Sequence, residues 1–143
     1  MFLKKQKGFT LIELLAVIVI LAVIAFIAIP LIMGTITKAK KNSAVDSAYG
    51  YMKAVEQAIG EAQVDDPTGA FDISGQTVKV KNNGNKVTVS KGGSNVDIDV
   101  NYKGSVPKDN DTLTYDENGR VTTGTLHIGG YTVTIANDKA TVN

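Results

Sequence analysis

The chain of 143 residues has no cysteine, no tryptophan and a single histidine, His127. Without cysteine, disulfides, thiolate zinc sites, iron–sulfur clusters and a cysteine nucleophile are all excluded. An excess of charge of one sign is also missing, because 15 basic residues face 14 acidic ones and the formal net charge is +1. A dedicated nucleic-acid binder normally has a strong basic surplus, so that class is disfavoured. The length suits one domain of ordinary size.

The charged and apolar residues are distributed unevenly along the chain. Residues 1–41 have six lysines and one acid, Glu13, for a net charge of +5, whereas residues 42–143 have a net charge of −4. Between Phe9 and Ile36, Glu13 is the only charged side chain, and most other residues are Leu, Ile, Val, Ala or Phe. The average composition therefore hides a basic start, a long apolar run and an acidic remainder.

The apolar run is long enough to cross a membrane as a helix. About 20 apolar residues span the ~30 Å hydrocarbon core of a bilayer, and residues 9–36 exceed that length. A buried core helix is a poor alternative, because the rest of the chain is too polar and too short to surround it. A cleaved secretory signal would have a shorter apolar region, of about 7–15 residues. Three lysines precede the run and three come after it, so charge counting leaves the orientation open.

The helix is expected to continue beyond the apolar run. From Thr37 to Gln63, apolar residues recur at helical spacing and form one stripe. The stripe consists of Val45, Ala48, Met52, Val55, Ile59 and Ala62. Pro30 removes one backbone hydrogen bond and can kink the helix. We therefore predict one helix from about Phe9 to Gln63, with a membrane-spanning part over residues 9–36 and an amphipathic part over residues 37–64.

Residues 65–143 have the pattern of short β-strands. Apolar and polar residues alternate in several runs, from Val78 and Val80 to Ala140 and Val142. Asn- and Gly-rich turns separate these runs, since both residues tolerate positive φ. Each predicted strand has one apolar face, which the helix stripe would cover. The expected fold class is α+β, a long N-terminal helix packed on a small antiparallel sheet.

The most specific motif lies at the start of the apolar run. It reads Lys4-Lys5-Gln6-Lys7-Gly8-Phe9-Thr10-Leu11-Ile12-Glu13-Leu14-Leu15. A short basic leader, a Gly-Phe junction and a glutamate four residues after Phe9 coincide here. This segment resembles the class III signal sequence of type IV pilins and pseudopilins. The local resemblance covers about residues 4–40, and the order of a long helix and a small sheet extends it, more weakly, to the type IV pilin fold.

The resemblance implies how the chain is processed and with what it associates. A membrane prepilin peptidase would cleave after Gly8, removing the leader 1–8, and would N-methylate the new terminus, Phe9. The leader would lie in the cytoplasm and residues 65–143 outside the inner (cytoplasmic) membrane. A pilus assembly platform and its ATPase would then move the single-pass precursor from the membrane into a helical surface filament. The implied partners are these proteins, the membrane before assembly, and further copies of the chain.

Glu13 is the residue that physical chemistry singles out in the apolar run. A carboxylate in an apolar segment is costly without a partner. The resemblance implies that this partner is the Phe9 amine of a neighbouring copy, a pairing that would also fix the axial register; the alternative is a carboxylate pointing to lipid headgroups. Pro30 also matches a family position. With Gly34 it would assist unwinding of the helix in a filament, or else simply mark the exit from the membrane.

Other candidate chemistry is sparse. The family that the chain resembles contains pseudopilins that bind Ca²⁺ in loops of this domain, so the weak calcium candidates here are Asp109, Asp111 and Asp116. Stretches rich in Asp and Asn are, however, usually turns. His127 stands between two apolar residues and is expected to point outward. No Ser/His/Asp set and no phosphate-binding loop is recognisable. We therefore expect no enzymatic activity, no cofactor and no direct nucleic-acid binding.

Three functions remain open from the sequence. The first is the major pilin of a type IV pilus, used in adhesion, twitching or gliding motility, or biofilm formation, because the predicted sheet domain is small and has no added module. The alternative is a pseudopilin of a type II secretion or competence DNA-uptake system. An anchored receptor or enzyme domain would require a ligand module or a catalytic cluster, and neither is recognisable. Gram-negative pilins usually close a C-terminal loop with a disulfide, which this chain cannot form because it has no cysteine. In this respect the chain most resembles the cysteine-free major pilins of Gram-positive bacteria such as clostridia.

Overall fold

The computed structural model describes residues 8–66, 72–91 and 93–143. In these ranges one helix, α1 (Leu11–Asp65), precedes seven strands. The strands are β1 (Thr77–Lys81), β2 (Lys86–Lys91), β3 (Ser94–Asp99), β4 (Thr112–Tyr115), β5 (Val121–Ile128), β6 (Tyr131–Ala136) and β7 (Lys139–Val142). The chain divides into two compact units, Met1–Lys38 and Ala39–Asn143.

The first unit is a stretch of α1 with an apolar surface. The helix continues through Pro30 without interruption. Every large apolar side chain from Phe9 to Ile36 is at least 47% exposed. Its most apolar window has a mean hydropathy of 3.3 and none of it is buried, so this helix is long and apolar enough to cross a membrane. A continuous apolar surface of this extent requires cover by lipid or by other protein surfaces.

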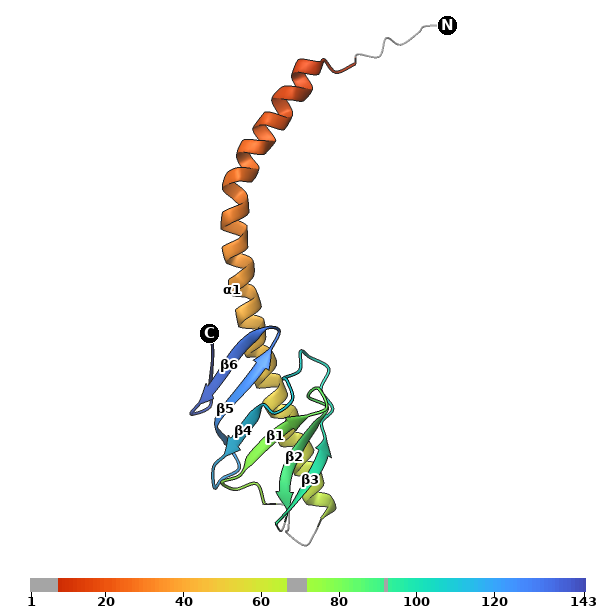
Figure 1. The fold of residues 1–143 in the computed structure, drawn as a ribbon, viewed down its shortest axis with the longest axis vertical. Helices are drawn as coiled ribbons and strands as arrows, with labels where there is room; N and C mark the ends of the chain where they lie inside the picture. Colours follow the sequence, from red (N-terminus) through yellow and green to blue (C-terminus); the bar gives the residue numbers. More distant parts are fainter. Residues whose placement is uncertain (1–7, 67–71, 92) are drawn as a thin grey trace, which may run out of the picture. The chain divides into compact units, whose positions relative to one another are not determined.

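The second unit contains a seven-stranded antiparallel sheet. The strand order is β3-β2-β1-β4-β5-β6-β7. Strands β1 to β3 form the predicted meander, and β4 to β7 form a second one that adds to β1 (Figure 1). Because β4 pairs with β1 rather than with β3, the connection over residues 100–111 must cross two strands.

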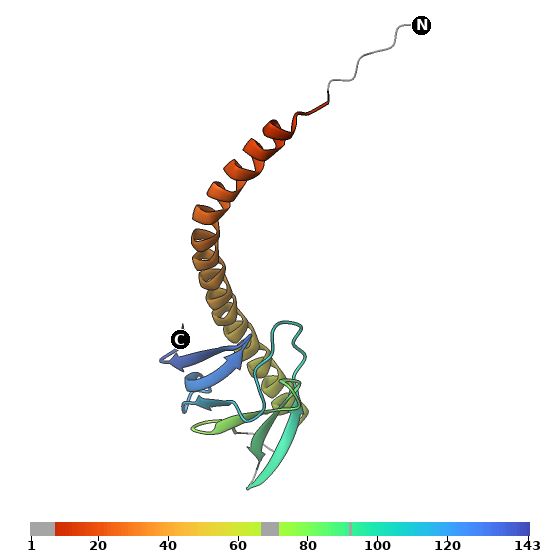
Figure 2. The ribbon, with the colours of Figure 1, turned by 45° about the horizontal axis from the view of Figure 1, so that its top comes forward.

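The core of the second unit lies between α1 and one face of this sheet. Figures 1 and 2 show the strands beside the C-terminal part of the helix in both views. Ala48, Tyr51 and Val55 of the helix are fully buried, in one cluster with apolar strand residues such as Val80 and Leu126. Each large aliphatic side chain buried in this way contributes about 1.5–3 kcal/mol. The predicted α+β class, a long helix packed on an antiparallel sheet, is confirmed.

The buried helix face differs in detail from the predicted stripe. Ala48, Met52, Val55 and Ile59 are buried as expected, whereas Val45 and Ala62 are only partly covered. Tyr51 is also buried, with Ala44 and Ala58. The Tyr51 ring packs edge-on against Tyr102 at a centroid distance of 5.7 Å. The buried face is therefore wider than an aliphatic stripe alone.

Tyr102 leaves the sheet and joins the long connection to the helix. Strand β3 ends at Asp99, although the alternating pattern continues to Tyr102. The Tyr102 hydroxyl donates a hydrogen bond to the Ser47 carbonyl, at 3.1 Å. Gly50 and Gly104 make room for this ring, because a Cβ on Gly104 would collide with it. Contact with α1 therefore ends the strand earlier than alternation predicts.

The edge strand β7 is held by a helix side chain. The Ala140 backbone N–H donates a hydrogen bond of 2.9 Å to the Tyr49 hydroxyl. The same hydroxyl donates to the Asp138 carbonyl at 3.5 Å. Tyr49 thus attaches the turn before β7 and its second residue to the helix.

Candidate functional site: the start of α1

The start of α1 has a reciprocal capping arrangement between Thr10 and Glu13. The Thr10 backbone N–H donates a hydrogen bond to Glu13 Oε2, at 2.8 Å. In return, the Glu13 backbone N–H donates to Thr10 Oγ1, at 3.3 Å. This is the capping box, in which two backbone donors that lack helical partners are satisfied by side chains. The Glu13 carboxylate also lies at the positive end of the helix dipole.

Thr10 is a residue that the sequence interpretation missed. The pattern Thr-x-x-Glu ahead of an apolar run is a known signature of a helix start. It predicts a helix beginning directly after Thr10, and α1 begins at Leu11. Glu13 therefore has an acceptor role within its own chain as well as the predicted role between copies.

Gly8 and Phe9 precede the helix. Both residues are exposed, and the Phe9 side chain is 90% exposed. The peptide bond between them is thus outside regular structure, as proteolytic cleavage requires. The remainder of the predicted leader, residues 1–7, lies outside the described residues.

Pro30 and Gly34 lie in an unbroken part of α1. Nothing within 4 Å would meet a Cβ on Gly34. Two hydroxyls nearby bond back to the helix, Thr35 Oγ1 to the Leu31 carbonyl and Thr37 Oγ1 to the Met33 carbonyl. Side chains that bond to carbonyls one turn earlier weaken and bend helices slightly. With the backbone bond missing at Pro30, this segment is a locally weak part of the helix.

The weak calcium candidates serve as hydrogen-bond acceptors. Asp109 Oδ1 accepts from the Asn83 N–H at 2.7 Å. Asp116 Oδ1 accepts from the Asn118 and Arg120 N–H groups at 2.8 and 2.9 Å, and the Arg120 bond is the main cause that lowers the pKa of Asp116. Among the described residues, no group of three or more His, Asp or Glu side chains is arranged to hold a metal ion.

The third candidate, Asp111, is buried and pairs with His127. Asp111 Oδ1 lies 2.6 Å from His127 Nδ1. Its Oδ2 accepts from the backbone N–H groups of Lys108 and His127, at 3.0 and 2.5 Å. His127 is 44% exposed, in line with the predicted outward direction. The pair joins the end of the long connection to β5, and no local sequence pattern indicates it, because its members are 16 residues apart.

Comparison with known proteins supports the interpretation of the N-terminal segment. The family described as "Prokaryotic N-terminal methylation motif" matches residues 3–29. The chain is 42% identical over 52 residues to the type II secretion system core protein G of Escherichia coli K12. It is 50% identical over 42 residues to the protein of that name from Dickeya chrysanthemi, and 40% over 52 residues to that from Pectobacterium carotovorum.

These matches are partial. They cover 36%, 29% and 36% of this chain and 36%, 28% and 33% of the three relatives, so the chain matches about a third of their length. No solved structure matches the chain significantly. None of the three relatives is clostridial, so the predicted clostridial affinity has no support. The chain carries the N-terminal methylation motif of type IV pilins and pseudopilins, on a long apolar helix that continues into an antiparallel sheet domain.

Proposed function

We propose that the chain is a pseudopilin, a structural subunit of the filament of a type II secretion system. The observation that carries this proposal is the combination of the methylation motif at residues 3–29 with similarity to type II secretion core protein G. The alternative, a major pilin of a type IV pilus, shares the same motif. It has less support, because all three of these relatives are secretion-system proteins.

The geometry at the start of α1 fits this use. Cleavage after Gly8 would leave the Phe9 amine one residue before the Thr10 N–H, whose hydrogen bond Glu13 accepts. The carboxylate is therefore already turned toward the end of the helix where the new positive charge arises. In a filament, the Phe9 amine of a neighbouring copy would pair with Glu13, and the apolar first unit would be covered by the same unit of other copies.

The segment from Pro30 to Thr37 would adjust when the chain leaves the bilayer. In lipid, every backbone group must be satisfied internally, which favours a continuous helix. In a filament, neighbouring chains replace lipid, and the weak segment at Pro30 and Gly34 can unwind to fit the packing. This role would be visible as a filament defect in Gly34→Ala, without loss of processing.

Processing is tested by the intact mass of the protein purified from membranes. The expected product lacks residues 1–8 and carries one additional methyl group on Phe9. Co-expression with an inactive prepilin peptidase should leave the full precursor. A chain that keeps Met1 in the presence of active peptidase contradicts the proposal.

Assembly is tested by Glu13→Ala. The variant should be cleaved normally but should form few filaments, because the Phe9 amine of the neighbour has no counter-charge. Thr10→Ala is the matched control, since it removes one capping bond and keeps the carboxylate. Normal filaments from Glu13→Ala would overturn the pairing.

Deletion in the source bacterium separates the two filament functions. For a pseudopilin, secreted proteins should accumulate inside the cell envelope, whereas surface pili should persist. Loss of long surface filaments with normal secretion would favour the major pilin. Complementation with the unaltered chain is the control.

A further inference from the structure

The two edges of the antiparallel sheet differ in how well their backbone groups are covered. β3 is the last strand on one side of the sheet and β7 is the last on the other (Figure 1). β7 has four residues, and its Ala140 N–H is bonded to Tyr49. β3 has six residues, which pair with β2 at consecutive positions without a bulge. The edge formed by β3 is therefore the longer and more regular one.

The outward backbone groups of β3 belong to Asn95, Asp97 and Asp99. In an antiparallel pair, successive residues of a strand point their N–H and C=O groups alternately toward the neighbouring strand and away from it. The Val100 N–H donates to the Asn85 carbonyl on the β2 side, at 2.8 Å, so the even-numbered residues of β3 bond to β2. In the part of the chain that the structure describes, no group accepts a hydrogen bond from the three outward N–H groups.

β3 has few of the features that keep an exposed sheet edge from pairing. Such edges are usually protected by proline, lysine, a bulge or a charge that points into the core. The residues from Ser94 to Asp99 include no proline and no lysine, and the side chains on the buried side of the strand are Val96 and Ile98. This edge is therefore suited to accept a further strand, a mode of recognition in which main-chain hydrogen bonds supply the affinity.

We propose that an extended segment of a separate polypeptide adds to β3 as a further antiparallel strand. Strand β2 shows which chemistry fits, because it already pairs with the other side of β3. There Thr88 lies opposite Asp97. Lys86 lies opposite Asp99, and two valines lie opposite the aliphatic residues of β3. The segment that fits the free edge thus alternates hydroxyl or basic residues with aliphatic ones, and Asp99, whose side chain is 84% exposed, is accessible to it.

A hollow beside the end of β3 would receive one side chain of the added segment. It lies between α1 and the residues at and after the end of β3, and its volume is about 340 Å³. Ala54 and Ala58 of the helix line it, together with Asp99 and several polar residues. A strand that runs past Asp99 would therefore place a side chain against the two alanines.

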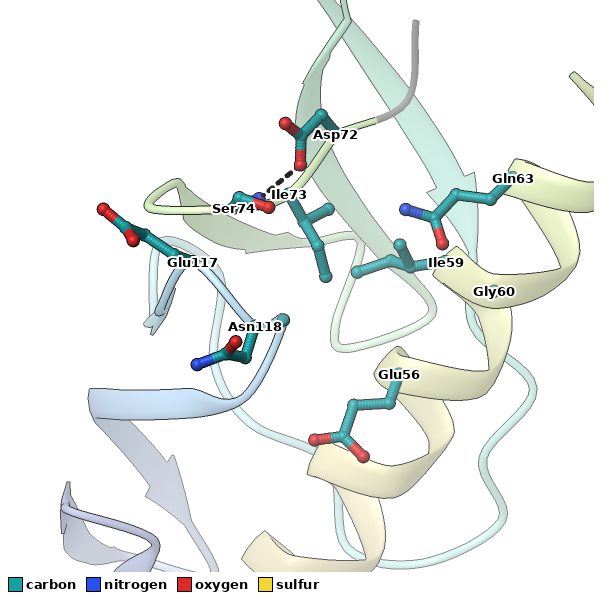
Figure 3. Close-up of a pocket in the computed structure, with 10 residues that line it drawn as sticks. Glu56, Ile59, Gly60, Gln63, Asp72, Ile73, Ser74, Glu117 and Asn118 are labelled. Carbon is teal, nitrogen blue, oxygen red and sulfur yellow. Dashed lines mark hydrogen bonds between the residues drawn. The ribbon is translucent and has the colours of Figure 1, made fainter. Parts of the chain in front are cut away.

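The other hollow at this end of α1 does not extend this surface. Figure 3 shows it between the helix, the residues before β1 and the turn after β4, where Ile59, Ile73 and Glu117 line it. Among the described residues around it, none belongs to β3. The docking surface is thus limited to the β3 edge and the hollow beside it.

A second copy of the chain is a poor occupant of this edge. Antiparallel pairing of two β3 strands about Asp97 would place this carboxylate opposite its own copy, and like charges in opposite positions destabilise a sheet. Copies in a helical filament are related head to tail, so the same surface of two copies does not meet. The edge that a head-to-tail contact can offer is β7, whose Ala140 N–H is already bonded. This exclusion rests on the proposed function, whereas the open edge does not.

Hydrogen exchange of the full chain in detergent micelles tests the edge with a defined peptide. The peptide has the sequence of residues 85–91, which includes β2. In the free chain, the amides of Asn95, Asp97 and Asp99 should exchange faster than that of Ile98, which bonds within the sheet. Saturating peptide should slow these three amides about tenfold or more, because they then donate to its carbonyl groups.

Two controls show whether the peptide binds as a strand at β3. The same peptide with Thr88→Pro lacks the N–H that would face Asp97, so it should give little protection. Exchange at Val133, in β6, should be unchanged by either peptide.

Asn95→Pro tests the same contact from the side of the chain. Proline is tolerated on edge strands where the N–H points to solvent, so the urea midpoint of the variant should stay unchanged. The variant should bind the peptide about tenfold more weakly, because one donor is lost and the ring obstructs an approaching strand. Asn95→Ala keeps the N–H and should bind as the unaltered chain does. If Asn95→Pro unfolds, the Thr88→Pro peptide still decides the outcome.

The outcomes separate this inference from the proposed function. The docking is overturned if the peptide leaves the three amides unprotected, if the Thr88→Pro peptide protects them equally, or if a folded Asn95→Pro chain binds unchanged. Protection of these amides that rises with chain concentration, without peptide, would place a second copy on the edge and also overturn it. None of these results changes the pseudopilin proposal. Conversely, an unprocessed Met1 terminus contradicts that proposal and leaves peptide binding at β3 intact.

Discussion

The two units of the chain share one helix but differ in the exposure of its apolar side chains. In the first unit, Val17, Val19 and their neighbours are more than half exposed, whereas Val55 in the second unit has no exposed surface. The difference comes from the strands, because all of them belong to the unit that begins after Lys38. One part of α1 is thus stabilised by its own chain, and the other requires an external partner.

The two units therefore differ in what stabilises them. The second unit has a complete core, in which helix and sheet bury each other. In the described part of the first unit there is a helix but no buried core, so its apolar surface requires an external cover. Under the proposed function, lipid supplies this cover before assembly and other copies supply it afterwards. Substitutions in the two units should therefore change different measurements.

The largest effect is expected from a charge in the buried part of the helix. Val55→Asp places an unpaired carboxylate in the core and should cost about 4 kcal/mol or more of unfolding free energy. Urea unfolding, followed by near-ultraviolet circular dichroism of the tyrosines, measures this loss. Carbonate extraction should show unchanged membrane insertion. Lys53→Gln, on an exposed position of the same helix, should change stability little, and loss of membrane insertion in Val55→Asp would contradict the separation.

Glycines should respond differently in the two units. Gly84 has a φ of +77°, and a Cβ there would lie 2.6 Å from the Val106 Cβ. Gly84→Ala should therefore destabilise the second unit by about 2–4 kcal/mol, from backbone strain and overpacking together. Gly75→Ala is the control, because its φ of +70° is similar but nothing lies within 4 Å.

The matching change in the first unit should have the opposite sign. Gly34 is helical and open, so Gly34→Ala should stabilise the helix by about 0.5–1 kcal/mol. Helicity in detergent, followed by thermal circular dichroism, measures it. A destabilising effect there would show that Gly34 has a contact that a single copy does not provide.

A smaller loss is expected at the helix–strand hydrogen bond. Tyr49→Phe removes the hydroxyl that accepts from the Ala140 N–H and should cost about 1 kcal/mol. Hydrogen exchange should become faster at Ala140 and stay unchanged at Val133 in β6. Equal exchange at Ala140 in both proteins would contradict the role of Tyr49.

The smallest effect is expected on the stability of the fold at acidic pH, from a change at Asp97. The Thr88 hydroxyl and Lys81 hold the pKa of Asp97 below its ordinary value. A carboxyl with a lowered folded pKa stabilises the fold above its unfolded pKa of about 3.9, and this is lost as the pH falls through the folded value. Asp97→Asn should therefore lower the melting temperature slightly at pH 7 and flatten its decline between about pH 5 and 2. A profile parallel to that of the unaltered chain would count against this coupling.

The sequence predicted the elements better than their ends and contacts. Strand positions could be found from alternation, because apolar residues of β1 to β6 are buried on one face and those of β7 are partly covered. The helix α1 could be found from its length and spacing. The end of β3 was misjudged, because Tyr102 bonds to Ser47, 55 residues earlier. Burial of Tyr51 was missed for the same reason, since its partner is the ring of Tyr102.

At the candidate site, residues close together in the sequence could be identified from local patterns, whereas contacts between residues far apart in the sequence could not. Glu13 was identified because a carboxylate in an apolar run is rare. The role of Thr10 is indicated by an equally local pattern, Thr-x-x-Glu before an apolar run. The Asp111–His127 pair required the register of β5 beside the long connection. The choice between pilin and pseudopilin depended on the relatives, since both use the same N-terminal chemistry.

The hydroxyl of Tyr49 also limits how copies of the chain can add to one another. The outer strands of an open sheet present free backbone groups on which another chain can add as a strand. At β7, the Ala140 N–H is already taken by Tyr49, and the strand is only four residues long. Strand-by-strand growth at this edge is thereby obstructed. Fibre formation of the amyloid kind, in which strands of successive copies pair, is therefore disfavoured at β7.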